Sequence, residues 1–295
     1  MKIEPGHIAV VTGAGSGIGR ALALQLSATG VHVSLCDVSE RGLAETKALC
    51  LDGAPAGTRT HTFLADVSRE ADVLAFRDSV LAAHATTSVQ LVFNNAGIGG
   101  GGSFVSDPQA TWERTFNVCW GGVYNVTRAF IAAMIRAPQA RLVNVSSVNG
   151  FWASLGPTTT HTAYSAAKFA VKGFTEALIV DLRLNAPHVG VSLVMPGHVG
   201  TSIVHNTLAE FGADLDADAK EAVIQRAEAF RGGGLTPVQA AEIILDGVRT
   251  GRWRILVGPD AHALDRAVRA DPETAYDLDF FDRLARYAAE PSQPA

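Results

Sequence analysis

The 295-residue chain is 47% hydrophobic and 18% charged, which is enough apolar material for one large domain whose core needs no disulfide or metal. Its net charge is −5 and its Lys and Arg residues gather into no stripe, so nucleic acid is not an expected partner. The three cysteines lack CxxC spacing, and the nine histidines lack HExxH or clustered ligand spacing. With no apolar signal region and no run of ~18 apolar residues, we expect a soluble cytoplasmic protein with no membrane segment and no metal.

Short apolar runs alternate with segments of helical periodicity along the chain. This alternation is typical of a parallel sheet wrapped by helices, with strands buried on both faces. The expected strands are 7–12, 31–36, 61–65, 89–93, 141–145, 191–195 and 253–257. The expected helices are 18–28, 39–49, 69–84, 110–136, 163–184 and 237–250. The predicted fold class is therefore α/β.

Two regions depart from this alternation. Residues 201–234 are polar and acidic and end in GGG, and we interpret them as a hinged flap. Residues 259–295 are expected to form a helical extension that packs on the domain or on a neighbouring subunit. Because no linker or repeat divides the chain earlier, residues 1–258 are predicted to be one domain.

The first predicted strand leads into a glycine-rich turn, TGAGSGIG. Ligands of open α/β sheets bind beyond the carboxyl ends of the strands. Gly13, Gly17 and Gly19 would let the backbone approach a pyrophosphate at the N-terminus of the following helix. The GxxxGxG spacing is not the GxGxxG fingerprint, and by itself it equally predicts a tight turn that needs positive φ.

An acid follows the second and the third predicted strands. Asp37 stands where a carboxylate can accept hydrogen bonds from an adenosine ribose. A 2′-phosphate would bring a like charge against it, and no basic residue follows until Arg41, which predicts NAD rather than NADP. The alternative for Asp37 is a helix N-cap, although Ser39 could fill that role. For Asp66, an adenine contact and a helix cap are predicted with equal weight.

Tyr164 and Lys168 lie four residues apart on one face of a predicted helix. An isolated pair of this kind is more often solvated surface. Here Ser146 and Ser147 leave the strand before this helix, and Asn117 lies on the long helix before that strand. Tyrosine has a pKa of about 10, so a nearby ammonium is needed to favour phenolate at neutral pH. Together these side chains predict positioned proton transfer.

Six motifs occur in order along the chain. They are TGxxxGxG (12–19), Asp37, Asp66 with Val67, NNAG (94–97), YxxxK (164–168) and PGxVxT (196–201). On these motifs, residues 7–258 resemble the short-chain dehydrogenase/reductase (SDR) family. The resemblance implies a Rossmann-like, doubly wound, parallel seven-stranded sheet of order 3-2-1-4-5-6-7. It also implies a nicotinamide cofactor and a homodimer or homotetramer formed through the two long helices, 110–136 and 163–184.

The resemblance further implies roles for single residues. In the implied catalytic tetrad, Tyr164 is the acid/base and Lys168 binds the nicotinamide ribose and lowers the tyrosine pKa. Ser147 orients the substrate oxygen and Asn117 supports a proton relay. The implied cofactor contacts are Gly13, Ser16, Gly17, Ile18, Gly19, Asp37, Asp66, Val67, Asn94, Ala96, Gly97, Tyr164, Lys168, Pro196, Gly197, Val199 and Thr201.

The stretch between Ser147 and Tyr164 is longer than is usual in the family, with 156–161 as the inserted residues. The insertion leaves Ser146 as the alternative to Ser147, which is preferred as the second serine of the pair. The expected substrate-lining residues are Ser147, Phe151, Trp152 and Tyr164, with His161 beside Phe151 and Trp152. For Phe151, Trp152 and His161, ordinary loop packing is the equal alternative. For His198 we expect a local structural part.

These observations predict an oxidoreductase that transfers a hydride between NAD(H) and a secondary alcohol or ketone, with Tyr164 exchanging the proton. The apolar residues of the flap (Ile203, Val204, Leu208 and Phe211) favour a mid-sized apolar substrate. An NADPH-dependent carbonyl reductase is the alternative within this class. A catalytically vestigial protein that senses dinucleotides is the alternative from another class.

Overall fold

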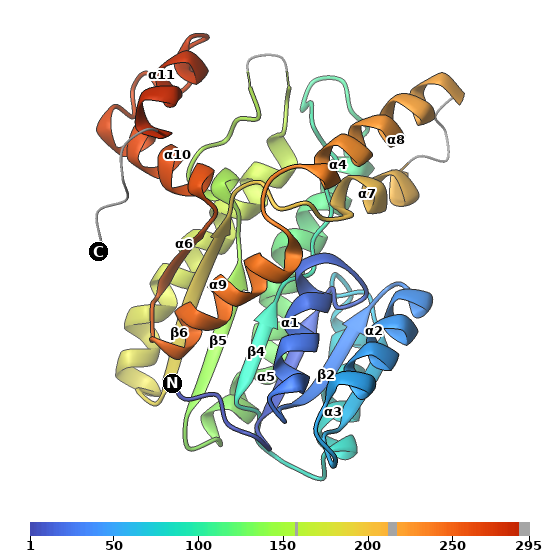
Figure 1. The fold of residues 1–295 in the computed structure, drawn as a ribbon. Coiled ribbons are helices and arrows are strands. Elements are labelled where there is room, and N and C mark those ends of the chain that lie inside the picture. The colour runs from blue at the N-terminus through green and yellow to red at the C-terminus, as the bar shows by residue number, and fades with distance from the viewer. Residues whose placement is uncertain (157–158, 212–216, 289–295) are drawn as a thin grey trace.

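The computed structural model describes residues 1–156, 159–211 and 217–288. Within them, seven strands form one parallel sheet in the order β3-β2-β1-β4-β5-β6-β7 (Figure 1). The strands are β1 (Ile8–Thr12), β2 (His32–Asp37), β3 (Thr60–Leu64), β4 (Leu91–Asn94), β5 (Ala140–Val145), β6 (Val189–Pro196) and β7 (Arg254–Val257). The predicted fold class and strand order are confirmed. The order reverses between β1 and β4, where ligands of such sheets bind.

Helices connect the strands and cover both faces of the sheet (Figure 1). They are α1 (Gly17–Ala28), α2 (Glu40–Gly53), α3 (Glu70–Ala83), α4 (Gln109–Phe116), α5 (Gly122–Ile135), α6 (Thr162–Asn185), α7 (Ile203–Phe211), α8 (Ala217–Gly232), α9 (Pro237–Arg249), α10 (Pro259–Ala270) and α11 (Phe280–Ala288). A π-helical turn η1 (Asn117–Gly121) joins α4 to α5, and a short 3-10 turn η2 (Val148–Gly150) follows β5.

The sheet is buried on both faces, as its continuous apolar strands predict. On one face Leu22 of α1 and Ile244 of α9 belong to the same core cluster as Val11. On the other face Phe76 of α3 and Phe130 of α5 belong to the cluster that contains Val10. Alternate residues of β1 therefore point into opposite cores. Packing on both faces fixes the position of the end of β1 relative to the helices.

One helix predicted to be continuous, 110–136, is interrupted by η1. Such single π turns occur frequently at functional sites. The whole stretch Gln109–Ile135 is long and apolar enough to cross a membrane by length and composition, but more than half of its apolar window is buried inside the fold. Burial of this kind is what a core helix shows.

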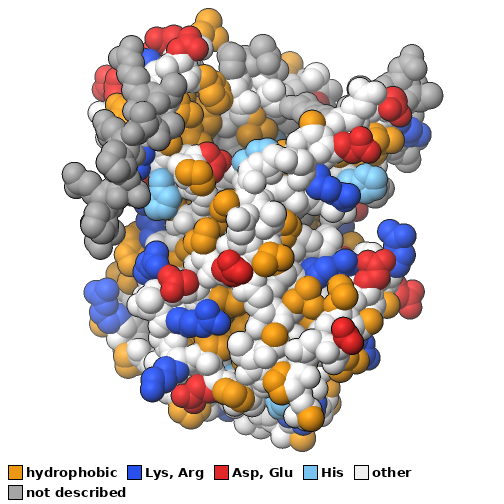
Figure 2. All heavy atoms as spheres, in the orientation of Figure 1, with side chains coloured by type: hydrophobic (Ala, Val, Ile, Leu, Met, Phe, Trp, Pro, Cys, Tyr) orange, Lys and Arg blue, Asp and Glu red, His pale blue; other side chains and the backbone are white. Residues whose placement is uncertain are grey.

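The two regions that depart from the alternation are both helical. The interpreted flap contains α7 and α8, and the extension contains α10 and α11. Leu264 and Phe280 of the extension share a buried cluster with Trp152. Of the two packing alternatives, the structure shows the extension against its own domain. On the face drawn in Figure 2, basic and acidic side chains are interspersed.

Candidate active site

The glycine turn between β1 and α1 packs directly on the NNAG segment. Gly13 and Gly17 have φ of +64° and +53°, which favour glycine. A Cβ at Gly13 would lie 2.8 Å from the Ala96 Cα, and one at Gly19 would overlap the Gly13 carbonyl oxygen. The turn therefore needs these glycines for its own packing.

The same turn leaves donors for a ligand. Ser16 is the N-cap of α1, and its side chain makes no capping hydrogen bond. The first N–H groups of a helix have no acceptor within the helix, so they are available to an anion. The start of α1 thus has the donor set that the diphosphate of a dinucleotide needs.

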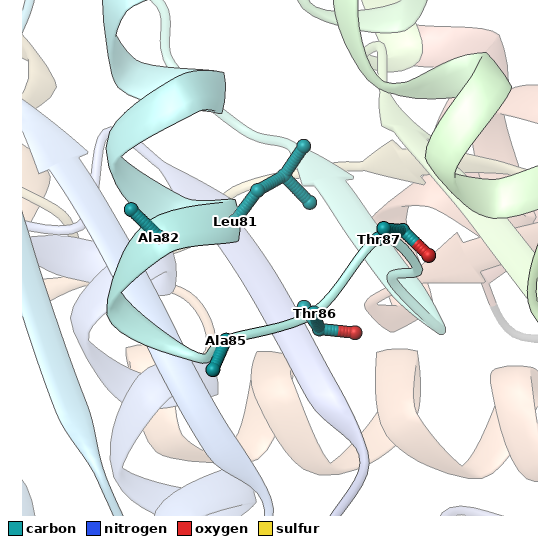
Figure 3. Close-up of a pocket in the computed structure, with 5 residues that line it drawn as sticks. All are labelled: Leu81, Ala82, Ala85, Thr86 and Thr87. Atoms are coloured by element: carbon teal, nitrogen blue, oxygen red, sulfur yellow. The ribbon is translucent and has the colours of Figure 1, made fainter.

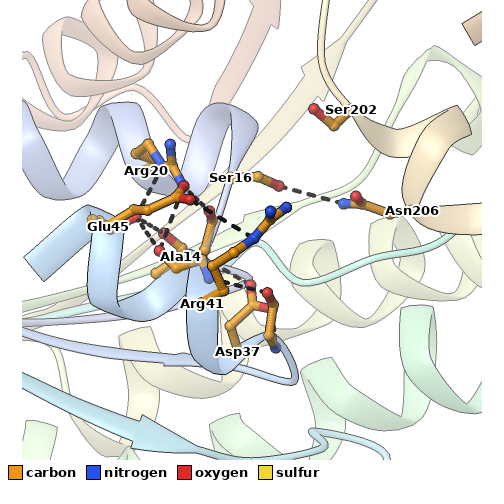
Figure 4. Close-up of polar contacts among 12 residues, drawn as sticks. Ala14, Ser16, Arg20, Asp37, Arg41, Glu45, Ser202 and Asn206 are labelled. Atoms are coloured by element: carbon orange, nitrogen blue, oxygen red, sulfur yellow. Dashed lines mark hydrogen bonds and ion pairs between the residues drawn. The ribbon is translucent and has the colours of Figure 1, made fainter. Parts of the chain in front are cut away.

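Asp37 ends β2 beside this turn (Figure 4). Its Oδ2 accepts a hydrogen bond from the Gly15 N–H at 2.8 Å, and its Oδ1 accepts one from the Ser39 N–H at 2.9 Å. The N-cap of α2 is Ser39, whose Oγ accepts from the Gly42 N–H at 3.1 Å. The structure therefore decides against the capping alternative for Asp37 and leaves its carboxylate at the turn.

The two arginines near Asp37 are directed to another acid (Figure 4). Arg20 Nη2 lies 2.8 Å from Glu45 Oε2, and Arg20 also donates to the Gly15 carbonyl oxygen. Arg41 Nε lies 3.8 Å from Glu45 Oε1. Glu45 thus offsets part of the positive charge that would otherwise attract a 2′-phosphate near Asp37.

Asp66 is occupied by protein contacts on both carboxylate oxygens. Oδ1 accepts from the Ser68 N–H at 2.9 Å and from its hydroxyl at 2.7 Å, and Oδ2 accepts from Arg114 Nη1 at 2.7 Å. Burial raises the pKa of Asp66, but these hydrogen bonds and the guanidinium charge outweigh it and hold the pKa below its usual value. The contacts to Ser68 close a turn before α3, but the N-cap of α3 is Arg69 and no side chain caps it, so the capping alternative for Asp66 is wrong. The adenine contact stays a prediction.

The structure turns the Asn94 side chain inward. Asn94 is 2% exposed and donates to Thr127 Oγ1 at 3.0 Å and to Asn144 Oδ1 at 2.8 Å. These contacts bind β4 to β5 and α5, so the Asn94 side chain is engaged by the protein, and Asn94 as a cofactor contact stays a prediction. Asn95 instead faces the glycine turn and donates to the Thr12 and Gly13 carbonyl oxygens at 3.0 and 3.2 Å. Sequence reasoning did not single out Asn95.

Tyr164 and Lys168 lie at the carboxyl edge of the sheet. Lys168 is 2% exposed, and its Nζ lies 5.3 Å from the Tyr164 ring centroid and donates to the Val145 carbonyl oxygen at 2.9 Å. A Cβ at Gly97 would lie 3.6 Å from the same Nζ. Because NNAG packs on Gly13, the pair stands next to the glycine turn and is not solvated surface.

The two serines after β5 have different contacts. The Ser146 hydroxyl donates to the Lys168 carbonyl oxygen at 2.8 Å and is buried in helix packing. Ser147 is joined to Tyr164 by a side-chain hydrogen bond, and its Oγ accepts from the Asn149 N–H at 3.1 Å. The geometry therefore favours Ser147 over Ser146 as the partner of Tyr164.

The protein alone does not make Tyr164 a base at neutral pH. Burial raises its pKa, the nearby Cys119 adds to this, and the hydrogen bond from Ser147 acts in the opposite direction. Burial also lowers the pKa of Lys168. The pair is thus desolvated, so a charge brought into the site acts strongly on it.

Cys119, which the sequence analysis did not assign to the site, lies beside the lysine. Asn117 is exposed at the start of η1, whereas Cys119 is fully buried and its Sγ donates to the Ile98 carbonyl oxygen at 3.2 Å. A Cβ at Gly97 would be 3.6 Å from Cys119 Sγ and from Lys168 Nζ alike. Residues two positions apart on a helix point to nearly opposite sides, so Asn117 and Cys119 differ in their surroundings, and the part of Asn117 in a proton relay stays a prediction. The signal that could have found Cys119 is its apolar phase with Val123, four residues on.

The flap and the PGxVxT segment lie against the glycine turn. A Cβ at Gly17 would meet the Thr201 side chain at 3.3 Å, and Asn206 Nδ2 of α7 donates to Ser16 Oγ at 3.3 Å (Figure 4). The His198 ring hydrogen-bonds to the Phe230 carbonyl oxygen at 2.8 Å and lies 4.3 Å from its ring. His198 therefore has the local structural part that was expected.

The remaining predicted cofactor residues frame the same edge. The Ala96 N–H donates to Thr12 Oγ1 at 3.0 Å, Val67 packs against Gly122, and Ile18 is partly buried on the core. Pro196 ends β6, Val199 is 3% exposed, and a Cβ at Gly197 would overlap the Asp260 carboxylate.

The aromatic residues predicted to line the substrate differ in what they contact. Trp152 is 3% exposed, and its Nε1 donates to the Ala275 carbonyl oxygen at 2.7 Å, so its prediction as a substrate-lining residue is corrected to packing against the extension. Phe151 is partly buried, with the Arg254 guanidinium 5.8 Å from its ring. The His161 ring centroid lies 4.6 Å from that of Tyr164.

A surface hollow of about 680 Å³ lies far from these residues, at the end of α3 (Figure 3). It is lined by Leu81, Ala82, Ala85, Thr86 and Thr87. The chain enters β4 just after it, so the hollow is at the amino edge of the sheet. Having no titratable side chain, it adds nothing to the chemistry of the opposite edge.

Residues 7–211 match the family described as short chain dehydrogenase. The chain belongs to this family of oxidoreductases. It is 38% identical over 269 residues to the protein SadH of Mycobacterium tuberculosis, covering 91% of this chain and 92% of that one. A Burkholderia phymatum SDR in complex with NAD is 32% identical, with a TM-score of 0.79 and full coverage of both chains. A metagenomic short-chain oxidoreductase in complex with NADP is 27% identical, with a TM-score of 0.65 and coverage of 87% and 98%.

Proposed function

We propose that this protein transfers a hydride between NAD(H) and a secondary alcohol or ketone of mid-sized apolar type. One observation carries the proposal: Tyr164, hydrogen-bonded to Ser147, stands beside a buried Lys168 that reaches the turn packed on Gly13. A phenol, a hydroxyl and an ammonium thus meet at the edge where the unpartnered N–H groups of α1 also lie.

Individual residues would hold the cofactor along this edge. The start of α1 takes the diphosphate, Asp37 the adenosine ribose, and Lys168 and Thr201 the nicotinamide end. When bound, the nicotinamide supplies the hydride donor or acceptor and, in its oxidised form, a positive charge.

Tyr164 exchanges a proton with the substrate oxygen, which Ser147 holds against it. Each unit by which the tyrosine pKa falls corresponds to about 1.4 kcal/mol of preferential stabilisation of phenolate. Since burial raises that pKa in the protein alone, Lys168 contributes fully only in the assembled site. Positioned proton transfer of this kind contributes roughly 10²- to 10⁴-fold in rate.

The preference for NAD rests on Asp37 and Glu45. A 2′-phosphate about 4 Å from Asp37 would cost ~1 kcal/mol even at the dielectric constant of water. Glu45 also engages Arg20, the closest guanidinium to the turn. The measurement is kcat/KM with each cofactor for one alcohol, and higher efficiency with NADP(H) would favour the carbonyl-reductase alternative.

Replacing Tyr164 by Phe tests the proton transfer. Turnover of secondary alcohols should fall by roughly 10²-fold or more, while the Kd for NAD, measured by calorimetry, stays within about twofold. Tyr124→Phe is the matched control, because Tyr124 is 49% exposed on α5. Unchanged turnover in Tyr164→Phe would overturn the assignment. A wild-type protein that binds NAD but oxidises no alcohol in a broad panel would favour the sensor.

A homo-oligomer through α5 and α6 and a cytoplasmic location belong to the same proposal. Phe169, Val180 and Leu184 expose 41%, 55% and 76% of their surface on α6, which is an apolar face for a second copy. All three cysteines are buried and unpaired, as suits a reducing compartment. Light scattering tests the assembly, and a monomer at micromolar concentration would remove it.

A further inference from the structure

The segment 148–161 connects the two residues that hold the substrate oxygen in the proposed function. It begins directly after Ser147 and ends three residues before Tyr164. What fixes its position therefore decides what surrounds the substrate.

The beginning of the segment is fixed by the C-terminal extension. The Trp152 ring lies 5.0 Å from that of Phe280 and 5.4 Å from that of Phe281. Its Nε1 donates to the Ala275 carbonyl oxygen at 2.7 Å, a buried contact. The Ala153 N–H donates to the Tyr276 hydroxyl at 3.1 Å. Two hydrogen bonds and an aromatic cluster thus join the extension to consecutive residues of the segment.

Further along, the segment meets an aromatic side chain of α11. Gly156 has a φ of +112°, and a Cβ built there would lie 3.5 Å from the Phe281 ring. Phe281 is nevertheless 41% exposed. Phe281 therefore lies close to the segment at Gly156 and also presents apolar surface to solvent.

The end of the segment reaches the catalytic tyrosine. The Thr162 N–H donates to the Gly102 carbonyl oxygen at 2.9 Å, and Trp112 Nε1 donates to Thr162 Oγ1 at 3.1 Å. The His161 ring lies 4.6 Å from that of Tyr164. Residues 152, 153 and 156 are thus held by the extension, and Thr162, where α6 begins, is held by the body of the domain.

The extension also touches the PGxVxT segment just before the flap. Asp260 of α10 accepts a hydrogen bond from the His198 N–H at 2.5 Å. The His198 ring in turn contacts Phe230 near the end of the flap. One helical pair therefore supports both chain segments that would border the substrate.

We propose that α10 and α11 determine substrate specificity by holding residues 148–156, the first described part of the connection that leaves Ser147 toward Tyr164. Trp152 and Tyr276 act as positioning residues, and Phe281 provides apolar surface at the entrance. The ligand class is a secondary alcohol with a bulky apolar group, selected over short alcohols. This inference rests on the proposed function and adds its specificity determinant.

The first test removes one donor or acceptor at a time. Trp152→Phe deletes the donor to Ala275, and Tyr276→Phe deletes the acceptor of Ala153. Each should accelerate hydrogen–deuterium exchange in 148–156 while exchange in β1 and α1 stays unchanged. Trp253→Phe is the control, since Trp253 is 45% exposed before β7. Unchanged exchange in both variants would overturn the holding role, whether or not the protein oxidises alcohols.

The second test measures specificity. In Phe281→Ala, kcat/KM for a bulky alcohol such as a hydroxysteroid or 2-decanol should fall about tenfold relative to 2-propanol, with the Kd for NAD unchanged. Trp152→Phe should shift the same ratio mainly through KM. An active wild type whose substrate ratio is identical in both variants would refute the inference alone. A wild type that oxidises none of these alcohols would refute the proposed function, and the exchange measurement would still decide the holding role.

Discussion

The two halves of the site are held together in different ways. The cofactor half (residues 12–19, Asp37 and 94–97) meets through backbone atoms, such as Gly13 against the Ala96 Cα and Thr12 Oγ1 accepting from the Asn95 and Ala96 N–H groups at 3.0 Å. The substrate half (residues 146–164 with α10 and α11) meets through side chains distant in sequence, such as Trp152 and Ala275, which are 123 residues apart. The cofactor half therefore has no room for an added atom, whereas the substrate half can be repacked residue by residue.

The largest effect should come from adding one methyl group to the cofactor half. In Gly19→Ala the new Cβ overlaps the Gly13 carbonyl oxygen. The turn must shift, at a cost of ~1–3 kcal/mol, and the Kd for NAD should rise roughly 10- to 100-fold. Calorimetric titration of folded protein measures it. Gly53→Ala is the control, because nothing lies within 4 Å of a Cβ there. A Kd unchanged in Gly19→Ala would show that the turn is not rigid.

Removing the Asp37 carboxylate should have a smaller effect on the cofactor half. In Asp37→Ser the like charge against a 2′-phosphate is lost, so kcat/KM with NADP should rise about fivefold or more. With NAD it should fall, because the ribose loses its acceptor. Asp52→Ser, at an exposed position of α2, should change neither value. If Asp37→Ser left the ratio of the two cofactors unchanged, the preference would have another origin.

Cys119 of η1 lies close to both Gly97 of the cofactor half and Lys168, so replacing it tests how the two halves meet. In Cys119→Ala the Ile98 carbonyl oxygen loses its donor beside Lys168, so kcat should fall roughly fivefold and its pH profile should move. Cys119→Ser keeps a donor and should restore most of the rate. Asn117→Ala tests the predicted relay separately, and a kcat within about twofold of wild type would remove Asn117 from it. Equal losses in Asn117→Ala and Cys119→Ala would support the relay role predicted for Asn117.

The same contrast explains how far the sequence can be interpreted. Apolar runs and their exits predicted the strands and the glycine turn, because each depends on residues close in sequence, whereas the strand order was implied by the resemblance to the SDR family. The Thr236 capping box at the start of α9 is equally local. Trp152 could not be placed, since its partners Ala275 and Phe280 come from the far end of the chain. The inward side chain of Asn94 and the place of Cys119 beside Lys168 were not predicted, because composition alone does not tell which face of a strand or helix is turned to the ligand.

The smallest effect on activity should come from a third region at the amino edge of the sheet, where His84 stacks on His32 at 5.7 Å and lies 6.5 Å from His61. Burial, helped by Arg59 and the other two histidines, lowers the pKa of His84 to about 4. A histidine with a depressed folded pKa contributes stability that is complete above the unfolded value, ~6.5, and is lost as the pH falls toward 4. Urea unfolding at pH 7 and pH 5 should therefore show a loss that shrinks in His84→Gln, while the exposed His188→Gln keeps the wild-type slope. Since this cluster touches neither half of the site, the Kd for NAD and the substrate ratio at pH 7 should stay at wild-type values. A change in either value would mean that the histidine cluster at the amino edge affects binding at the catalytic edge. The cofactor half and the substrate half would then not depend on their own contacts alone.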